Sequence, residues 1–371
     1  MSFLLFLSRS RPASPVLEQA QKLIDSGMNW DALMAEAGRH GTSGFIYKNL
    51  QALENIPRKV LARFDNVHNQ MLRHNVMLAS EADRLLDALN AKGVEVITLK
   101  GPLTAEMIFG DIGLYPSGDI DMLIKVEDID LVVGCLESEG YQLNDKGFDT
   151  YRDFYIKELY HISLSNGRYT VEPHWNLFFR YFTTPPEFWW EDSRTVIKAD
   201  REYRFLSPEK DILYNSFRIF TKNFFPLRFL VMVAELIRFY EDEIDWDLMC
   251  RCARRYRFEN VLGTVLLMSA DLLGAKVPAE YARTRGGRSK LLYNMSVNMM
   301  FSETVPHPFH KIALVFMRDD IAGAARVILR RLFPSMGEII SRYKLSEGSP
   351  KAVIYYLLNP FFLYTRRRNR I

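Results

Sequence analysis

The sequence predicts an α+β protein, in which a mixed sheet is flanked by helices and followed by an all-α C-terminal domain. Three observations support this fold class. Apolar residues recur at helical spacing over residues 15–90, short β-branched segments follow from residue 94, and helical spacing returns after residue 207. The 371 residues suffice for two or three compact units. We expect these units at residues 1–92, 93–206 and 207–371.

The N-terminal region is expected to contain several helices, the last of them long. Apolar residues recur at helical spacing around residues 16–24 and again at Leu72, Val76, Ala79, Leu85, Leu86 and Leu89. Lys92 and Gly93 then interrupt the pattern, because glycine disfavours a helix interior. This interruption marks the expected end of the helical region.

Strands and helices alternate in the middle of the chain. Residues 94–99 are rich in β-branched side chains and predict a strand, and residues 103–109 predict the helix that follows it. After a turn-rich segment, residues 119–124 predict a second strand and residues 127–139 a second helix, which ends at Gly140. This alternation indicates an α/β core.

A β-hairpin is expected next, with strands at residues 161–164 and 168–175. Ser165, Asn166 and Gly167 form its predicted turn. Ser207 followed by Pro208 is a typical helix start, and we expect helices at residues 213–220, 227–240 and 246–256. The chain after residue 207 is therefore expected to be helical.

The composition limits the partners and the compartment. The 48 basic and 45 acidic residues give a net charge of +3, which argues against a protein dedicated to nucleic acids. The three cysteines make no disulfide framework, which suits a cytoplasmic location. The apolar N-terminus is short for a signal sequence, and no run reaches the roughly 20 apolar residues of a membrane span, so we expect no stable membrane insertion.

Two aspartates carry the clearest chemical signal. Asp119 and Asp121 are two residues apart in a strand pattern, so both side chains leave one face of the sheet while Ile120 and Met122 leave the other. Like charges this close are unfavourable unless a cation compensates them, as Mg²⁺ does when carboxylates and substrate phosphates bind it. Such a pair alone is also common at solvated strand ends, so its surroundings must decide.

Candidate partners stand on both sides of this pair. Lys100 and Gly101 lie where a strand meets a helix, and a cation, a flexible backbone and free helix N–H groups there are suited to phosphate oxygens. The alternative is an ordinary strand-to-helix turn. Glu172 and His174 share one face of the second hairpin strand. Glu172 is a candidate third metal ligand or general base, and His174 either orients the site or is structural.

Two further segments have competing interpretations. Arg218 and Lys222 lie four residues apart on one predicted helix face, as a phosphate-binding pair would, but exposed basic pairs are common and we expect these to be solvated. The apolar segment 352–364 is followed by arginines at positions 366, 367, 368 and 370. This pattern suits either an anchor on anionic lipid or a docked terminal helix with a solvated tail, and the internal proline favours the docked helix.

Several segments resemble one family in their order and spacing. They are Leu99-Lys-Gly, Tyr115-Pro-Ser-Gly-Asp-Ile-Asp-Met-Leu-Ile, Gly140-Tyr and Val171-Glu-Pro-His-Trp, with shorter matches through residues 206–246. These segments resemble bacterial uncharacterised nucleotidyltransferases of the polymerase-beta-like superfamily. The resemblance covers most of the chain past residue 94 and implies a nucleotidyltransferase-like mixed sheet.

The resemblance also implies an activity. The expected enzyme uses Mg²⁺ or Mn²⁺ to transfer a nucleoside monophosphate from a nucleoside triphosphate to an unidentified small-molecule or macromolecular acceptor, releasing pyrophosphate. The expected catalytic and metal-binding residues are Asp119, Asp121 and Glu172. The expected nucleotide-binding residues are Lys100, Gly101, Ser117 and His174.

Some positions depart from the family pattern. Tyr115 stands where an arginine is usual, Glu172 replaces an aspartate, and Arg218 and Lys222 stand where many relatives have histidines. Glu172 keeps the negative charge, whereas Tyr115 removes a contact to phosphate or carboxylate. The alternative function is therefore a non-catalytic or degenerate nucleotide-binding regulatory protein on the same fold.

Overall fold

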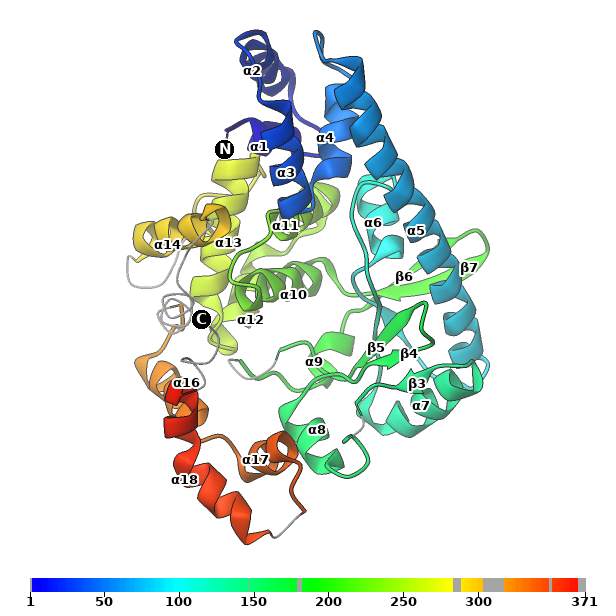
Figure 1. Cartoon of the computed structure of the whole chain (residues 1–371), viewed down its shortest axis with the longest axis vertical. Helices are drawn as coiled ribbons and strands as arrows, with labels where there is room; N and C mark the ends of the chain where they lie inside the picture. Colours follow the sequence, from blue (N-terminus) through cyan, green and yellow to red (C-terminus); the bar gives the residue numbers. More distant parts are fainter. Residues whose placement is uncertain are drawn as a thin grey trace.

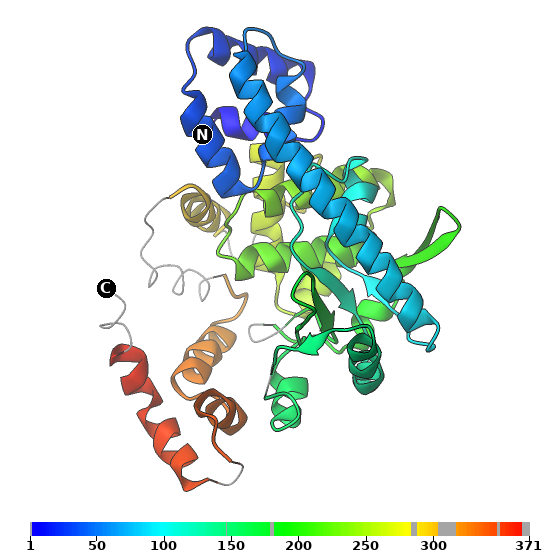
Figure 2. The same ribbon diagram turned by 45° about the vertical axis from the view of Figure 1, so that its right-hand side comes forward.

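The computed structural model describes residues 2–145, 147–178, 182–282, 288–302, 317–346 and 349–365. The N-terminal helices lie at one end of the long axis and the helices formed by residues 321–365 at the other (Figures 1 and 2). The sheet and the remaining helices lie between these two ends.

The N-terminal region is helical, as predicted. Its helices are α1 (Ser2–Leu7), α2 (Ser14–Asp25), α3 (Trp30–His40), α4 (Ser43–Leu50) and α5 (Arg58–Asn90). The 33-residue α5 runs from this end of the molecule to the sheet (Figure 2). Its first half contributes Val60 and Phe64 to one buried cluster, and its second half contributes Leu85 and Leu89 to another.

The central sheet has the strand order β1-β2-β5-β4-β3. Its strands are β1 (Ile97–Thr98), β2 (Ile120–Leu123), β3 (Gln142–Leu143), β4 (Leu164–Ser165) and β5 (Thr170–His174). β2 and β5 are parallel, whereas the other neighbours are antiparallel. The connecting helices are α6 (Pro102–Phe109), the 3-10 helix η1 (Val126–Asp128), α7 (Ile129–Ser138) and α8 (Arg152–Glu158). The predicted α+β class with a mixed sheet is confirmed.

Three details differ from the sequence prediction. The strand expected at residues 94–99 is shorter, because only Ile97 and Thr98 pair with β2. A second hairpin, β6 (Arg194–Lys198) and β7 (Arg201–Phe205), follows the short helix α9 (Glu187–Trp190) and was not predicted. Four of the five β6 residues are exposed, so this strand lacks the alternating apolar pattern that would identify it. The hairpin expected before it is present as β4 and β5, but β4 shares only Leu164 with the strand expected at residues 161–164 and includes Ser165 of the expected turn.

The described chain after residue 207 is helical, and α10 begins at Pro208 as predicted. Its helices are α10 (Pro208–Thr221), α11 (Arg228–Tyr240), η2 (Glu241–Glu243), α12 (Trp246–Arg255), α13 (Glu259–Leu273), α14 (Ser289–Phe301), α16 (Ile321–Leu332), α17 (Met336–Tyr343) and α18 (Pro350–Thr365). The larger buried cluster joins Phe45 of α4 to Phe217 of α10 and Val265 of α13. This core crosses both expected domain boundaries, and the three-domain division stays a prediction.

One side of the terminal helix α18 contacts helices α16 and α17. Asn359, which is 1% exposed, donates a hydrogen bond to the carbonyl of Leu332 at 2.9 Å and accepts one from Arg342 at 2.8 Å. The arginines at positions 366–370 lie outside the described residues. None of the described helices is long and apolar enough to cross a membrane.

Candidate active site

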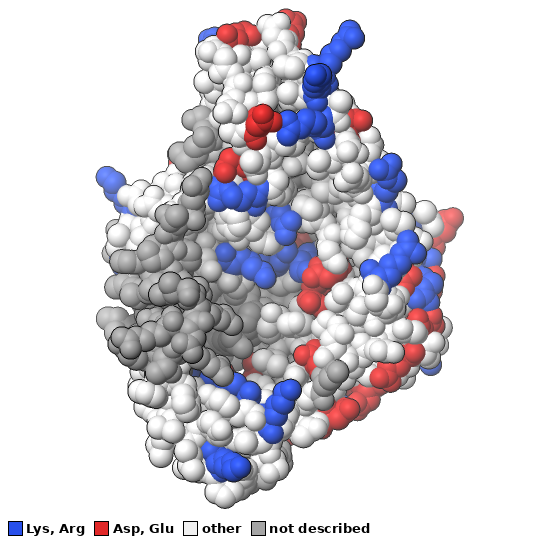
Figure 3. All heavy atoms as spheres, in the orientation of Figure 1, with Lys and Arg blue, Asp and Glu red and all other residues white. Residues whose placement is uncertain are grey.

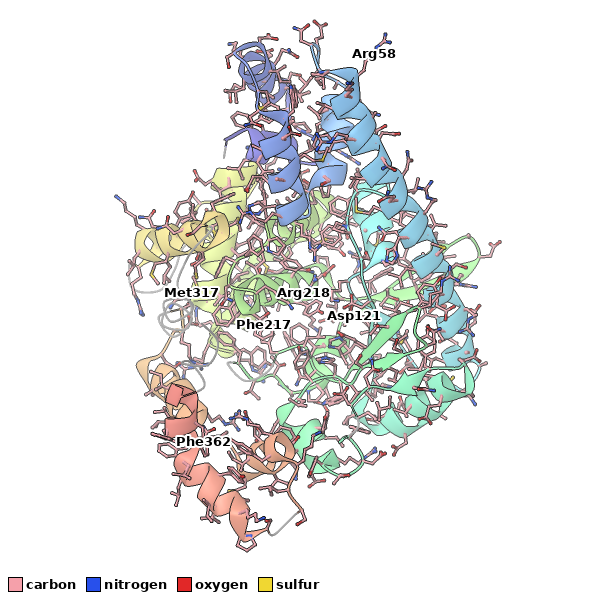
Figure 4. The ribbon with its side chains drawn as sticks, viewed as in Figure 1. Arg58, Asp121, Phe217, Arg218, Met317 and Phe362 are labelled. Atoms are coloured by element: carbon pink, nitrogen blue, oxygen red, sulfur yellow. The ribbon has the colours of Figure 1, made fainter. Side chains whose placement is uncertain are left out.

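A pocket of about 370 Å³ lies between strands β2 and β5 on one side and helices α10 and α11 on the other. Figure 3 shows a hollow near the centre of this face, with Lys and Arg atoms on one side of it and Asp and Glu atoms on the other. Figure 4 shows Asp121 on the sheet side and Arg218 on the α10 side. The fold therefore brings acids of the sheet opposite bases of the helices.

The two aspartates lie at the start of β2. Asp119 directly precedes the strand and Asp121 lies within it, and both contact Lys100. Ile120 and Met122 point the other way, into the buried cluster under the sheet. The Asp121 side chain is fully buried, whereas that of Asp119 is 34% exposed. The alternation inferred from the sequence is thus present.

Glu172 lies directly opposite Asp121. The two strands are parallel, and Asp121 and Glu172 are paired in register, so their side chains share one face of the sheet. His174 lies two residues further along the same face. One ligand atom each from Asp121, Glu172 and His174 lie within 4.8 Å of one another, a group that could hold a metal ion. Asp119 stands outside this group, beside Lys100.

The ammonium group of Lys100 lies between the two aspartates. Its Nζ donates a hydrogen bond to Asp119 Oδ1 at 2.7 Å and another to Asp121 Oδ2. Gly101 follows with a φ of 130°, a conformation that other residues rarely adopt, and turns the chain from β1 into α6. Lys100 therefore compensates the negative charge of the aspartates directly.

Two histidines complete the acidic side. Nε2 of His174 lies 2.9 Å from Asp121 Oδ1 and must donate, since an ionised carboxylate can only accept. The ring of His161 stacks on that of His174, with centroids 4.9 Å apart, and its Nε2 lies 4.0 Å from Glu172 Oε2. Nδ1 of each histidine is buried and has no hydrogen-bond partner among the described residues.

These contacts separate the pKa values of the facing acids. Burial opposes ionisation of Asp121, but Lys100 and His174 outweigh it and hold the pKa of Asp121 well below its usual value. Burial and the charges of Asp121 and Asp119 raise the pKa of Glu172 to about 7. Burial, with the neighbouring His174, lowers the pKa of His161 to about 3, so His161 is neutral near pH 7.

The loop before β2 contributes hydroxyl groups to the pocket. Asn75 of α5 holds this loop by donating hydrogen bonds to the carbonyls of Ile112 at 2.6 Å and Tyr115 at 2.8 Å. His74 Nε2 lies 3.1 Å from the carbonyl of Ser117. The Tyr115 hydroxyl and Ser117 Oγ are both buried without a hydrogen-bond partner in the described structure. Both residues line the pocket.

The basic side of the pocket corrects one prediction. Arg218 was expected to be solvated, but it is half-buried and lines the pocket with Lys222 and Arg228. Its guanidinium lies over the ring of Phe229, 4.9 Å from the centroid, and donates to Asn215 Oδ1 at 2.8 Å. The expectation failed because the i, i+4 spacing does not show which helix face a neighbouring element covers. Lys222 is exposed, as expected, yet it borders the same pocket.

All the expected site residues line this one pocket: Lys100, Gly101, Ser117, Asp119, Asp121, Glu172 and His174. The structure adds His161 and Arg228, which sequence reasoning missed. His161 stands just before β4 in an ordinary strand context, and Arg228 begins an apolar helix. His161 belongs to no recognisable motif. Arg228 lies in the Leu227-Arg segment that resembles the family, but that resemblance assigned it no role in the site.

In this fold a mixed sheet presents clustered carboxylates to basic side chains of helices across one pocket. This arrangement is typical of the class of proteins that bind phosphate esters together with a divalent cation. The chain belongs to the uncharacterised nucleotidyltransferase family, whose model matches residues 26–274. The matched segment includes every pocket residue named above. No curated protein and no solved structure was found to match the chain.

Proposed function

We propose that the protein is a metal-dependent nucleotidyltransferase of the polymerase-beta-like type, which transfers a nucleoside monophosphate from a nucleoside triphosphate to an acceptor. The observation that carries the proposal is the register pairing of Asp121 with Glu172 opposite Arg218 in a chain of this family. Acids able to bind a divalent cation and bases able to bind phosphates occupy one pocket, which is the combination that nucleotidyl transfer needs.

The basic wall is the proposed triphosphate site. Arg218, Lys222 and Arg228 supply positive charge. The unpaired hydroxyls of Tyr115 and Ser117 supply hydrogen bonds. Gly101, at the start of α6, allows the backbone to approach a phosphate closely. Together these groups would hold the triphosphate with its α-phosphorus toward the carboxylates.

The donor set fits Mg²⁺ or Mn²⁺. The carboxylates of Asp121 and Glu172 lie close enough to share a cation and supply the oxygen ligands that these ions prefer, and Asp119 stands beside them. A bound cation would neutralise the phosphates and polarise the α-phosphorus. We assign Glu172 to accept the proton of the acceptor hydroxyl while the acceptor oxygen bonds to the α-phosphorus. The bond to pyrophosphate then breaks and pyrophosphate leaves.

A non-catalytic nucleotide-binding protein is the second candidate. Tyr115 favours it, because this residue fills the place of a usual arginine and stacks on Phe109 with ring centroids 5.8 Å apart. The stacking makes the aromatic ring part of the core. A protein of this kind would bind nucleotide with metal and release no pyrophosphate.

Calorimetry and a turnover assay test the proposal together. We expect nucleoside triphosphate to bind in the presence of Mg²⁺ or Mn²⁺, and Asp121→Asn to abolish the metal dependence. Glu172→Gln should retain much of the nucleotide affinity and lose most pyrophosphate release, since a proton acceptor acts on the barrier. Asp31→Asn, an exposed acid far from the pocket in sequence, is the matched control.

The outcomes separate the candidates. Metal-dependent binding without pyrophosphate release, for every acceptor in a cell extract, would favour the regulatory protein. Nucleotide binding that is equal in the wild type and in Asp121→Asn would contradict the metal site in both candidates.

A further inference from the structure

Exposed apolar surface is concentrated at the C-terminal end of the described chain. Nine of the seventeen exposed large hydrophobic residues lie between positions 328 and 361. Five of them are on α18: Val353, Ile354, Leu357, Leu358 and Phe361, which are 42% to 63% exposed. This spacing of one, three and four residues places them along one face of the helix, which we call the α18 face.

The α18 face is turned away from the rest of the protein. The opposite side of the helix holds Ala352 and Asn359, which are both 1% exposed and anchor the helix. A solvent-exposed helix of a globular protein ordinarily buries its apolar side and exposes its polar side. α18 instead exposes an apolar face, and contiguous exposed apolar surface of this kind marks an interaction site.

The position of α18 leaves this face accessible. Both ribbon views place α18 at the outer edge of the molecule, at the end opposite the N-terminal helices (Figures 1 and 2). Ile328 and Leu329 of α16, a helix that contacts α18, are also exposed, at 47% and 56%. The pocket of the candidate active site includes no residue of α16, α17 or α18.

The charge of this region differs from that of the remaining chain. Residues 321–371 contain ten Lys or Arg and two Asp or Glu, a net charge of +8. The whole chain carries +3, so residues 1–320 carry −5. Figure 3 shows patches of Lys and Arg among uncharged atoms over α17 and α18. An apolar helix face within a strongly basic segment is typical of proteins that lie on anionic membrane surfaces.

We propose that α16–α18 dock the protein on an anionic phospholipid surface, with the α18 face in the interface and the exposed Lys351 of α18 near the headgroups. The 16 residues of α18 extend about 24 Å, so the helix lies on the surface and does not span the bilayer. A second copy of the chain fits this face less well, because two segments of +8 repel each other. An anionic membrane complements both the charge and the apolar face.

Co-sedimentation of the full-length protein with vesicles tests this proposal. We expect binding to vesicles of phosphatidylcholine mixed with phosphatidylglycerol, little binding to pure phosphatidylcholine, and weaker binding as salt is raised. The double variant Leu357→Ser/Phe361→Ser should reduce the bound fraction about tenfold or more, because less apolar surface enters the interface. The matched control is Ile197→Ser, which changes a 76% exposed residue on β6.

Circular dichroism and thermal unfolding of each variant show whether it is folded, and Leu357→Lys with Phe361→Lys provides a second pair at the same positions. Because lysine adds charge but removes apolar surface, this pair should also bind less. Equal binding to charged and neutral vesicles would overturn the proposal, as would full binding by both double variants. A dimer in light scattering that Leu357→Ser/Phe361→Ser dissociates would assign the face to a second copy of the chain.

Discussion

Asp121 and Glu172 lie side by side on the parallel strands β2 and β5, and their pKa values are shifted in opposite directions. Lys100 and His174 contact Asp121 and keep its pKa low. Among the described residues no cationic group contacts Glu172 as closely, and the nearest imidazole nitrogen, that of His174, lies 3.8 Å away. Burial and the neighbouring aspartates raise the pKa of Glu172 to about 7. One acid is therefore permanently charged near neutral pH and its neighbour is poised to titrate.

The Glu172 carboxyl should make the metal-free protein less stable as the pH rises. Its pKa is about 7 in the folded protein against 4.5 as a free side chain, so the folded state binds the proton more tightly. Ionisation of Glu172 therefore lowers the free energy of unfolding. This loss is absent below about pH 4.5, grows above it and is complete above about pH 7, where it reaches at most roughly 3 kcal/mol. Denaturant unfolding in a chelator at several pH values measures it.

Glu172→Gln is the variant for this measurement, because glutamine keeps the shape and does not titrate. The variant should lose less stability between pH 5 and about pH 7 than the wild type. Burial also raises the pKa of Asp211 to about 7, so the slope should decrease without disappearing. If the slope of unfolding free energy against pH is unchanged in Glu172→Gln, the raised pKa assigned to Glu172 is contradicted.

Lys100 should act as an internal counter-ion for the aspartates. Lys100→Met removes the positive charge and leaves Asp119 and Asp121 without their shared donor, which for a buried pair costs on the order of 3–5 kcal/mol. Added Mg²⁺ or Mn²⁺ should restore more stability to this variant than to the wild type, since a divalent cation replaces the missing charge. Thermal unfolding with and without the metal measures both effects.

The matched control for Lys100→Met is Lys125→Met. Lys125 pairs with Glu95 on the surface, where both side chains are more than a third exposed, and such pairs contribute about 1 kcal/mol or less. Two equal losses of stability would contradict the role given to Lys100.

Arg218 should govern the affinity for phosphates. Arg218→Gln removes a charged donor from the pocket, and a hydrogen bond to a charged group contributes roughly 1.5–3 kcal/mol, so triphosphate affinity should fall about tenfold or more. Nucleoside affinity should change much less. Calorimetry with the two ligands measures the difference.

The same experiment tests how Arg218 is held. Asn215 accepts a hydrogen bond from Arg218 at 2.8 Å and donates one to Asp211 at 2.7 Å, so Asn215→Ala should reproduce part of the triphosphate defect. Arg194→Gln, which alters a surface arginine paired with Glu243, serves as the control. A triphosphate affinity that is the same in Arg218→Gln and in the control would remove Arg218 from the proposed phosphate site.

Several features of the site depend on contacts between residues that are far apart in the sequence. The pairing of Asp121 with Glu172 depends on the register of two strands that are distant in the sequence. The pocket position of Arg218 depends on how α10 packs on α11, α12 and α13, and that of His161 on its bridge to His174. The outward direction of the α18 face depends on which side Asn359 anchors. Such contacts join residues far apart in the chain, and no short-range spacing encodes them.

Local relationships between neighbouring residues followed from the amino-acid sequence alone. Strand alternation placed Asp119 and Asp121 on one face and Glu172 and His174 on one face, because successive side chains point to opposite sides of a strand. The start of α10 followed from the preference of proline for the first turn of a helix, and the β4–β5 hairpin from its Asn-Gly turn, and both preferences act over a few residues. The facing of acids and bases across the pocket was decided only when the sheet and the helices packed together, since burial and charge pairing act through space.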